Sequence, residues 1–123
     1  MKQQLLLVED DRWWAENCQS ILARSGYSCA IATTADTALQ LIDDTSPLAI
    51  IVDFMLPGAN ALQLLHELQS YDDTHKLPVI LCTSLSITKE QGEAFEVYGI
   101  RLVLDKTTMT PRHLTKAVQA VIV

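Results

Sequence analysis

The sequence predicts an α/β fold: a (βα)5 three-layer sandwich in which helices cover both faces of a five-stranded parallel sheet. Short apolar runs alternate five times with stretches of helical periodicity. The strongest runs are continuously apolar, which is typical of strands buried on both faces. Because crossovers between parallel strands are right-handed, the helices between them are expected to form two outer layers.

The five expected strands differ in strength. Three are short, continuous and apolar, at 5–8, 48–52 and 79–82. Two are weaker, at 29–32 and 101–104. Each is followed by a stretch with apolar residues at helical spacing, so strands and helices alternate along the whole chain.

Five helices are expected from these spacings. The first should end at Ser25-Gly26, and the last should begin at Thr110-Pro111, with a cap residue and a proline in the first turn. The fourth stripe is the poorest and ends at Gly99. The five apolar stripes are Trp14, Cys18, Ile21 and Leu22; Ala38, Leu41 and Ile42; Ala61, Leu65 and Leu68; Ala94, Val97 and Tyr98; and Leu114, Ala117, Val118, Val121 and Ile122.

Composition excludes several classes of protein. A chain of 123 residues is the usual size of one domain, so residues 1–123 are expected to form one. The net charge of -6 argues against nucleic acid or an anionic membrane as a direct partner of this domain. No apolar run approaches the roughly 20 residues of a membrane span, and the first is too short for a signal peptide. Three cysteines without a CxxC motif are expected to be buried in a reducing, cytoplasmic environment.

Polar side chains follow four of the five strands. Glu9, Asp10 and Asp11 follow the first, Asp53 the third, Thr83 and Ser84 the fourth, and Asp105 and Lys106 the fifth. The carboxyl ends of parallel strands meet at one edge of a sheet, which is where ligands bind. Clustered carboxylates suit a hard cation, Mg²⁺ or Mn²⁺, and not zinc. A lysine and a hydroxyl beside the metal predict a phosphoryl site.

Each of these residues also has a purely structural interpretation. Asp10 or Asp11 could serve only as a helix cap, Thr83 could cap the next helix, and Lys106 could be a solvated surface lysine. The prediction of a site depends on their joint placement at four strand ends.

Four blocks of the sequence resemble the receiver domain of two-component response regulators. LLLVEDD resembles its first strand and acid pair, and IIVDFMLPG its third strand and phosphoacceptor. PVILCTS and LVLDK resemble its fourth and fifth strands. The resemblance covers essentially the whole chain. It implies a flavodoxin-like sheet of order 2-1-3-4-5, a cytoplasmic location and a role in phosphorelay signal transduction.

The resemblance also implies a role for each site residue. Asp53 would accept a phosphoryl group from a sensor histidine kinase, a histidine phosphotransfer protein or acetyl phosphate. Asp10, Asp53 and the backbone carbonyl of Met55 would hold Mg²⁺, with Glu9 acting through water. Lys106 would contact the phosphoryl oxygens, and Thr83 would couple the phosphoryl group to the rest of the fold. The chain would then be a switch rather than an enzyme, catalysing only its own phosphorylation and slow dephosphorylation.

The sequence departs from the family at functionally relevant positions. Val103 replaces an aromatic residue that usually turns inward, which puts the usual coupling to the threonine in doubt. Thr107 replaces a proline that usually follows a cis bond. A cis bond before a non-proline residue costs about 3 kcal/mol, so a trans bond is expected. In the family, the side chains at the positions of Met55 and Leu85 often influence the water that hydrolyses the acyl phosphate. Both side chains are apolar here, which predicts a long-lived phosphoryl group.

Two other functions compete with the phosphorylated switch. One is a constitutive protein-binding module that keeps the receiver fold without switching by phosphorylation. The other, an aspartate-nucleophile phosphatase, ranks far behind. Phosphatases of that class carry a second acid two residues after the nucleophile, where this chain has Met55.

Two surfaces are candidates for partners. Trp14 lies on the apolar stripe of the first helix and is expected in the core, whereas the adjacent Trp13 lies off it. Trp13 is therefore either an exposed anchor for a kinase or phosphotransfer helix, or a residue packed over a loop. The fourth helix (87–96), fifth strand and fifth helix form a dimer or output face in many family members. Gly92 weakens that fourth helix.

Overall fold

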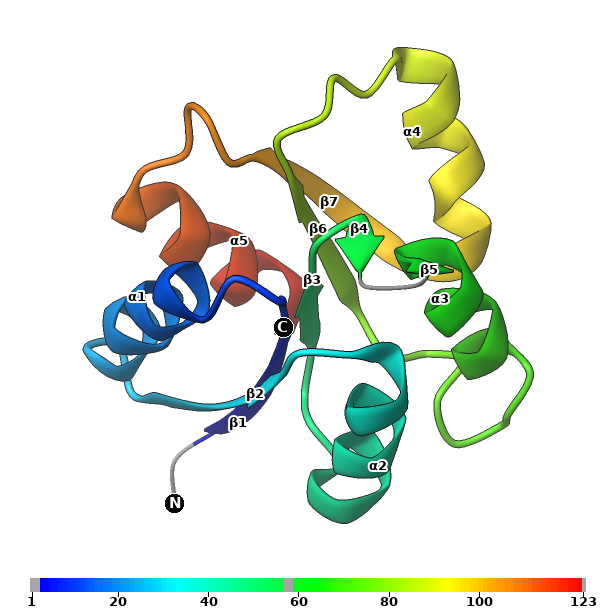
Figure 1. Cartoon of the computed structure of the whole chain (residues 1–123), viewed down its shortest axis with the longest axis horizontal. Coiled ribbons are helices and arrows are strands. Elements are labelled where there is room, and N and C mark those ends of the chain that lie inside the picture. The colour runs from blue at the N-terminus through cyan, green and yellow to red at the C-terminus, as the bar shows by residue number, and fades with distance from the viewer. Residues whose placement is uncertain (1–2, 57–58, 123) are drawn as a thin grey trace.

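The computed structural model describes residues 3–56 and 59–122, and its centre is a five-stranded parallel sheet in the order β2-β1-β3-β6-β7 (Figure 1). Counted along the chain, these strands follow the predicted order 2-1-3-4-5. The register places Leu6 of β1 opposite Ala30 of β2 and Ile50 of β3. The strands are β1 (Gln3–Val8), β2 (Tyr27–Ala32), β3 (Ile50–Val52), β6 (Val79–Thr83) and β7 (Ile100–Asp105).

Helices cover both faces of the sheet, as predicted for three layers. Figure 1 shows α1 and α5 on one side and α2, α3 and α4 on the other. Two hydrophobic clusters follow the same division, because neighbouring side chains of a strand point to opposite faces: Leu5 and Leu7 join one cluster, Leu6 and Val8 the other. The helices are α1 (Arg12–Ala23), α2 (Ala35–Thr45), α3 (Ala61–Gln69), α4 (Lys89–Phe95) and α5 (Pro111–Ile122).

Two helix starts follow from local sequence. At α5, the Thr110 hydroxyl accepts the His113 N–H, and His113 Nδ1 accepts the Thr110 N–H in return. At α4, Thr88 and Gln91 form a capping box. The fourth helix therefore begins two residues later than the predicted 87–96.

The predicted apolar stripe of the fourth helix is wrong. Ala94 and Val97 are exposed, and the buried residue is Phe95, whose ring centroid lies 6.0 Å from that of Phe54. Phe95 takes the core-facing position of α4, and Ala94, one residue earlier, points about 100° away from it. Val97 lies in the 3-10 helix (Glu96–Tyr98) that follows α4, where the residue spacing differs from that of an α-helix. The other four stripes are buried or partly buried.

A short hairpin after β3 was not predicted. It pairs β4 (Met55–Leu56) with β5 (Ala59–Asn60), and two-residue strands leave no periodicity in a sequence. Its effect is to bring the start of α3 beside β3, since the Ala61 N–H donates to the Phe54 carbonyl at 2.7 Å. Pro57 and Gly58, which end the third motif, lie outside the described residues.

Cys18, Cys29 and Cys82 are buried free thiols, as predicted. Among residues 3–56 and 59–122, no helix combines the length and apolar character that a membrane crossing requires.

Candidate metal and phosphoryl site

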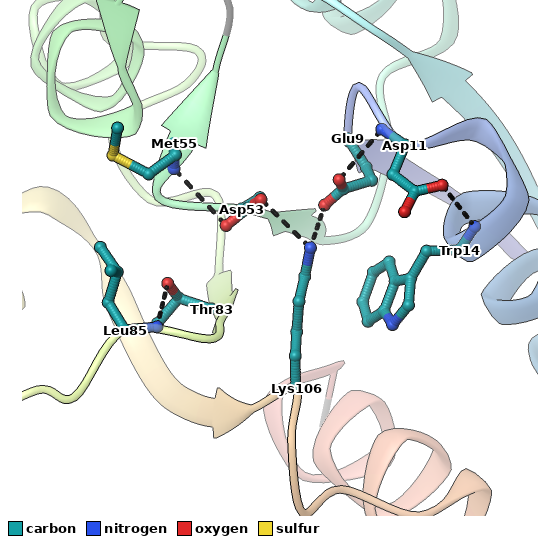
Figure 2. Close-up of polar contacts among 8 residues, drawn as sticks. All are labelled: Glu9, Asp11, Trp14, Asp53, Met55, Thr83, Leu85 and Lys106. Carbon is teal, nitrogen blue, oxygen red and sulfur yellow. Dashed lines mark hydrogen bonds and ion pairs between the residues drawn. The ribbon is translucent and has the colours of Figure 1, made fainter.

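The carboxyl edge of the sheet brings together Glu9, Asp53 and Lys106, which follow β1, β3 and β7 (Figure 2). Lys106 Nζ donates to Glu9 Oε2 at 2.6 Å and to Asp53 Oδ2 at 3.1 Å. Glu9 is almost wholly buried, and the Lys106 side chain is only 15% exposed. Two acids and one ammonium therefore share a partly desolvated edge.

Three acids of this edge could hold a cation. A carboxylate oxygen from each of Glu9, Asp10 and Asp53 lies within 4.8 Å of the others. Glu9 is buried, Asp53 is half-buried and Asp10 is exposed, so the group opens to solvent on one side. The donors are all oxygen, which fits Mg²⁺ or Mn²⁺ better than a softer metal.

Burial and pairing act in opposite directions on the charged groups. Burial raises the pKa of Glu9 above its ordinary value, although the hydrogen bond from Lys106 opposes the shift. Burial would lower the pKa of Lys106, but its hydrogen bonds to Glu9 and Asp53 outweigh that effect and raise it. Lys106 is therefore an ammonium at neutral pH, placed where negative charge would gather.

Asp11 is the helix cap among the acids of the first loop. Its Oδ1 accepts the Trp14 N–H at 3.2 Å, and its own N–H donates to Glu9 Oε1 at 3.1 Å. The capping interpretation thus holds for Asp11, while Asp10 joins the acid cluster. Asp11 also orients Glu9 toward Lys106.

Thr83 is a buried hydroxyl at the end of β6, only 1% exposed. Its Oγ1 accepts the Leu85 N–H at 3.1 Å, so it shapes the turn after β6. It does not cap α4, because Thr88 does. Its carbonyl accepts the Lys106 N–H at 3.0 Å, which ties the hydroxyl and lysine strand ends together. Ser84, the next residue, is exposed.

The loop after Lys106 is held by Asp105 and Thr107. Asp105 Oδ1 accepts the Thr107 N–H at 2.8 Å and the Thr107 hydroxyl at 2.6 Å. These hydrogen bonds lower the pKa of Asp105, which is exposed and lies outside the acid cluster. The Lys106–Thr107 peptide bond is trans, as predicted. Sequence reasoning missed this support, although an aspartate two residues before a threonine is a turn signal.

Trp14 corrects a second expectation. Its ring is only partly buried, at the margin of the core, and Lys106 Nζ lies 4.3 Å from the ring centroid. Nothing in the apolar spacing of the first helix indicated a contact with the lysine.

Met55 and Leu85 flank the site with exposed apolar side chains. Met55 is 56% exposed and its N–H donates to Asp53 Oδ1 at 3.4 Å, whereas Leu85 is 46% exposed. Beside them, the turn after β6, Gly92 of α4 and the end of β7 line an open groove of about 470 Å³. Val103 is one of the residues that line this groove.

The comparisons with known proteins agree on a family. The family model for the response regulator receiver domain matches residues 5–119. The regulatory protein VanRB of Enterococcus faecalis is 31% identical over 99% of this chain and 53% of its own length. The transcriptional regulatory protein CpxR of Escherichia coli is 30% identical over 96% of this chain and 48% of its own. The chain therefore spans about half the length of these relatives.

Solved structures give the same fold. A putative response regulator from Chloroflexus aurantiacus superimposes with a TM-score of 0.88 at 29% identity, covering 99% of this chain and 98% of that one.

Proposed function

Because the chain belongs to the response regulator receiver domain family, we propose that it is a Mg²⁺-dependent phosphoacceptor switch whose nucleophile is Asp53. The observation that carries the proposal is the position of Lys106, whose ammonium bridges Asp53 and Glu9 beside Asp10. The family is one of two-component phosphorelays, so the donor would be a histidine kinase or a phosphotransfer protein.

The reaction would be an in-line displacement on phosphorus. A carboxylate oxygen of Asp53 attacks the phosphoryl group as its bond to the donor breaks, the phosphoimidazole P–N bond or the P–O bond of acetyl phosphate. The bonding electrons leave with imidazole or acetate, and Asp53 becomes an acyl phosphate. No general base is needed, because the nucleophile carries no proton. Catalysis is therefore positioning and charge neutralisation.

Different residues of the site would neutralise the negative charge of the phosphoryl group from different sides. Asp10, Asp53 and the Met55 backbone carbonyl would hold Mg²⁺, with Glu9 acting through water. Bound Mg²⁺ would supply positive charge to the phosphoryl oxygens. Lys106 would donate to those oxygens from the other side, since its Nζ already lies 3.1 Å from Asp53 Oδ2.

Switching would start at Thr83. Its hydroxyl accepts the Leu85 N–H, which leaves its own proton free to meet a new phosphoryl oxygen. Movement of this turn would reshape the groove between α4 and β7. Val103 supplies no aromatic side chain to fill that groove, so we propose that the turn and α4 carry the change.

Mass spectrometry after incubation with acetyl phosphate and Mg²⁺ tests the proposal. The wild-type chain should gain one phosphoryl group, and Asp53→Ala should gain none. Asp73→Ala, which removes an exposed aspartate of the loop before β6, is the matched control and should gain one. Chelation of Mg²⁺ should abolish the gain. A chain that takes up no phosphoryl group from any donor would instead be the constitutive binding module. Val103 favours that alternative, because the family usually has an aromatic residue at this position.

We propose two surfaces for partner proteins. Trp13 is 73% exposed one turn from the acid cluster, which supports its role as an anchor for a kinase or phosphotransfer helix. A homodimer would use the face of α4, β7 and α5, where Leu102 and Val103 are 37% and 39% exposed.

The Trp13→Ala variant tests the first surface. It should slow transfer from a phosphohistidine donor protein more than transfer from acetyl phosphate, which needs no docking. Equal effects on the two donors would remove Trp13 from the docking surface.

A further inference from the structure

The indole of Trp14 lies against the cationic end of Lys106 (Figure 2). Lys106 Nζ is 4.3 Å from the centroid of the ring, inside the range of about 6 Å for a cation–π contact. We infer that Trp14 is a positioning residue, whose ring holds the Lys106 ammonium at the phosphoryl site. The consequence for phosphorylation rests on the proposed function, whereas the contact itself does not.

The contact with the ring and the contacts with the acids occur together. The same Nζ that faces Trp14 donates to Glu9 at 2.6 Å and to Asp53 at 3.1 Å. The ring therefore does not draw the ammonium away from the site. It forms one wall of the position that the ammonium occupies.

Trp14 differs from the acids in what it can do during the reaction. Glu9 and Asp53 change partners when a cation or a phosphoryl group engages their oxygens. The indole has no such alternative, because its attraction for the ammonium comes from the fixed quadrupole of the ring. Lysine has a flexible four-carbon stem, so a partner that persists through the reaction keeps Nζ in place.

The backbone and the side chain of Trp14 are each held in place. The backbone N–H of Trp14 donates to Asp11 Oδ1 at 3.2 Å, which holds the first turn of α1. The side chain packs against the hydrophobic cluster beneath α1 and α5. Trp14 is thus anchored in the hydrophobic cluster and limits the movement of the flexible Lys106 side chain.

Tryptophan fluorescence tests the contact without any phosphoryl donor. The chain has two tryptophans, so Trp13→Phe leaves Trp14 as the only tryptophan, which can be excited selectively over the tyrosines. Adding Lys106→Met to that background should change the emission of Trp14, because the charge over the ring is removed. Lys116→Met, on an exposed position of α5, is the matched control and should leave the emission unchanged. Identical emission with and without Lys106 would overturn the inference.

Phosphorylation kinetics test the role. Trp14→Leu should lower the rate with acetyl phosphate roughly two- to thirtyfold, the range of a cation–π contact converted to a rate. Trp14→Phe, which keeps a weaker aromatic face, should recover part of the loss. Ile21→Ala is the matched control: Ile21 packs on the same cluster from the same helix, away from Lys106. It should lose stability in urea but keep the wild-type rate.

The outcomes separate the two proposals. A wild-type rate in Trp14→Leu, with Asp53 still phosphorylated, would overturn the positioning role and leave the proposed function standing. If the wild-type chain takes up no phosphoryl group, the proposed function fails. The contact inference is then decided by the emission of Trp14 alone.

Discussion

Glu9 is buried at the end of β1, and Lys106 is the cation that donates to its carboxylate. Burial raises the pKa of Glu9, so the folded chain binds a proton there more readily than the unfolded chain does. Such a group lowers stability as the pH rises through the range above 4.5. Lys106 offsets this cost at neutral pH by pairing with the carboxylate.

The Lys106→Met variant should therefore have a pH-dependent defect. At pH 7 it should lose about 1–3 kcal/mol of unfolding free energy, because Glu9 keeps its charge without its partner. At a pH closer to 4.5 the defect should shrink, because burial raises the pKa of Glu9 and the carboxyl takes up a proton more readily there. Urea denaturation at the two pH values measures both, with the exposed Lys76→Met as control. A defect that is constant with pH would contradict this account.

Met55 and Leu85 should govern the lifetime of the phosphoryl group. Both are exposed beside Asp53 and Thr83, and neither side chain carries a strong hydrogen-bonding group that could position a hydrolytic water. Met55→Asn or Leu85→Asn should therefore shorten the lifetime of phosphorylated Asp53, measured by the decay of the phosphorylated mass after the donor is removed. Rapid decay in the wild-type chain would show that water is positioned by other groups.

At the scale of elements, α4 is the shortest α-helix in the described part of the chain. It is seven residues long, holds its N-terminus with the Thr88–Gln91 capping box, and contains Gly92. A Cβ atom added at Gly92 would meet no heavy atom within 4 Å. The glycine thus lowers helix propensity without being required by packing.

Gly92→Ala should accordingly stabilise the chain by about 0.5–1 kcal/mol. Gly26 is the matched control, because a Cβ there would also meet open space but its φ is +90°. Gly26→Ala should destabilise by about 1 kcal/mol or more for that reason alone. Denaturant midpoints measure the two variants. A destabilised Gly92→Ala would contradict the propensity argument and the open surroundings of Gly92.

At the scale of the whole molecule, the hydrophobic cluster between the sheet and helices α1 and α5 buries all three cysteines. Burial raises the pKa of Cys18 to about 12 and that of Cys29 to about 11, and it raises the pKa of Cys82 further. At pH 8 the folded chain therefore presents no reactive thiolate.

Alkylation of the thiols should report global unfolding. At pH 8 the three cysteines should react only as fast as the chain opens, and urea should accelerate all three together. Mg²⁺ should slow the labelling if the acid cluster binds it, because a ligand of the folded state stabilises that state. Mass spectrometry counts the labels. Fast reaction of one thiol in the absence of urea would place it in a region that opens independently.

Prediction from the sequence succeeded where a local pattern of residues determines the structure. Strands with continuous apolar runs, such as 79–82, had to be central because no face of them could tolerate water. The Thr110-Pro111 start of α5 needed only the chemistry of helix ends. It failed at Ala94 and Val97, because Phe95 rather than Ala94 faces the core and the 3-10 helix after Phe95 departs from the period of about 3.6 residues.

The sequence by itself determined the parallel sheet and the set of polar residues at its carboxyl edge. Strand order then forces those residues together, whatever their separation along the chain. Only the tertiary structure decided which acids share the cluster, with Asp10 inside it, Asp11 capping α1 and Asp105 holding the loop after β7. It also decided that Trp14 faces Lys106. Contacts of this kind depend on distances between strand ends and helix starts, which periodicity does not encode.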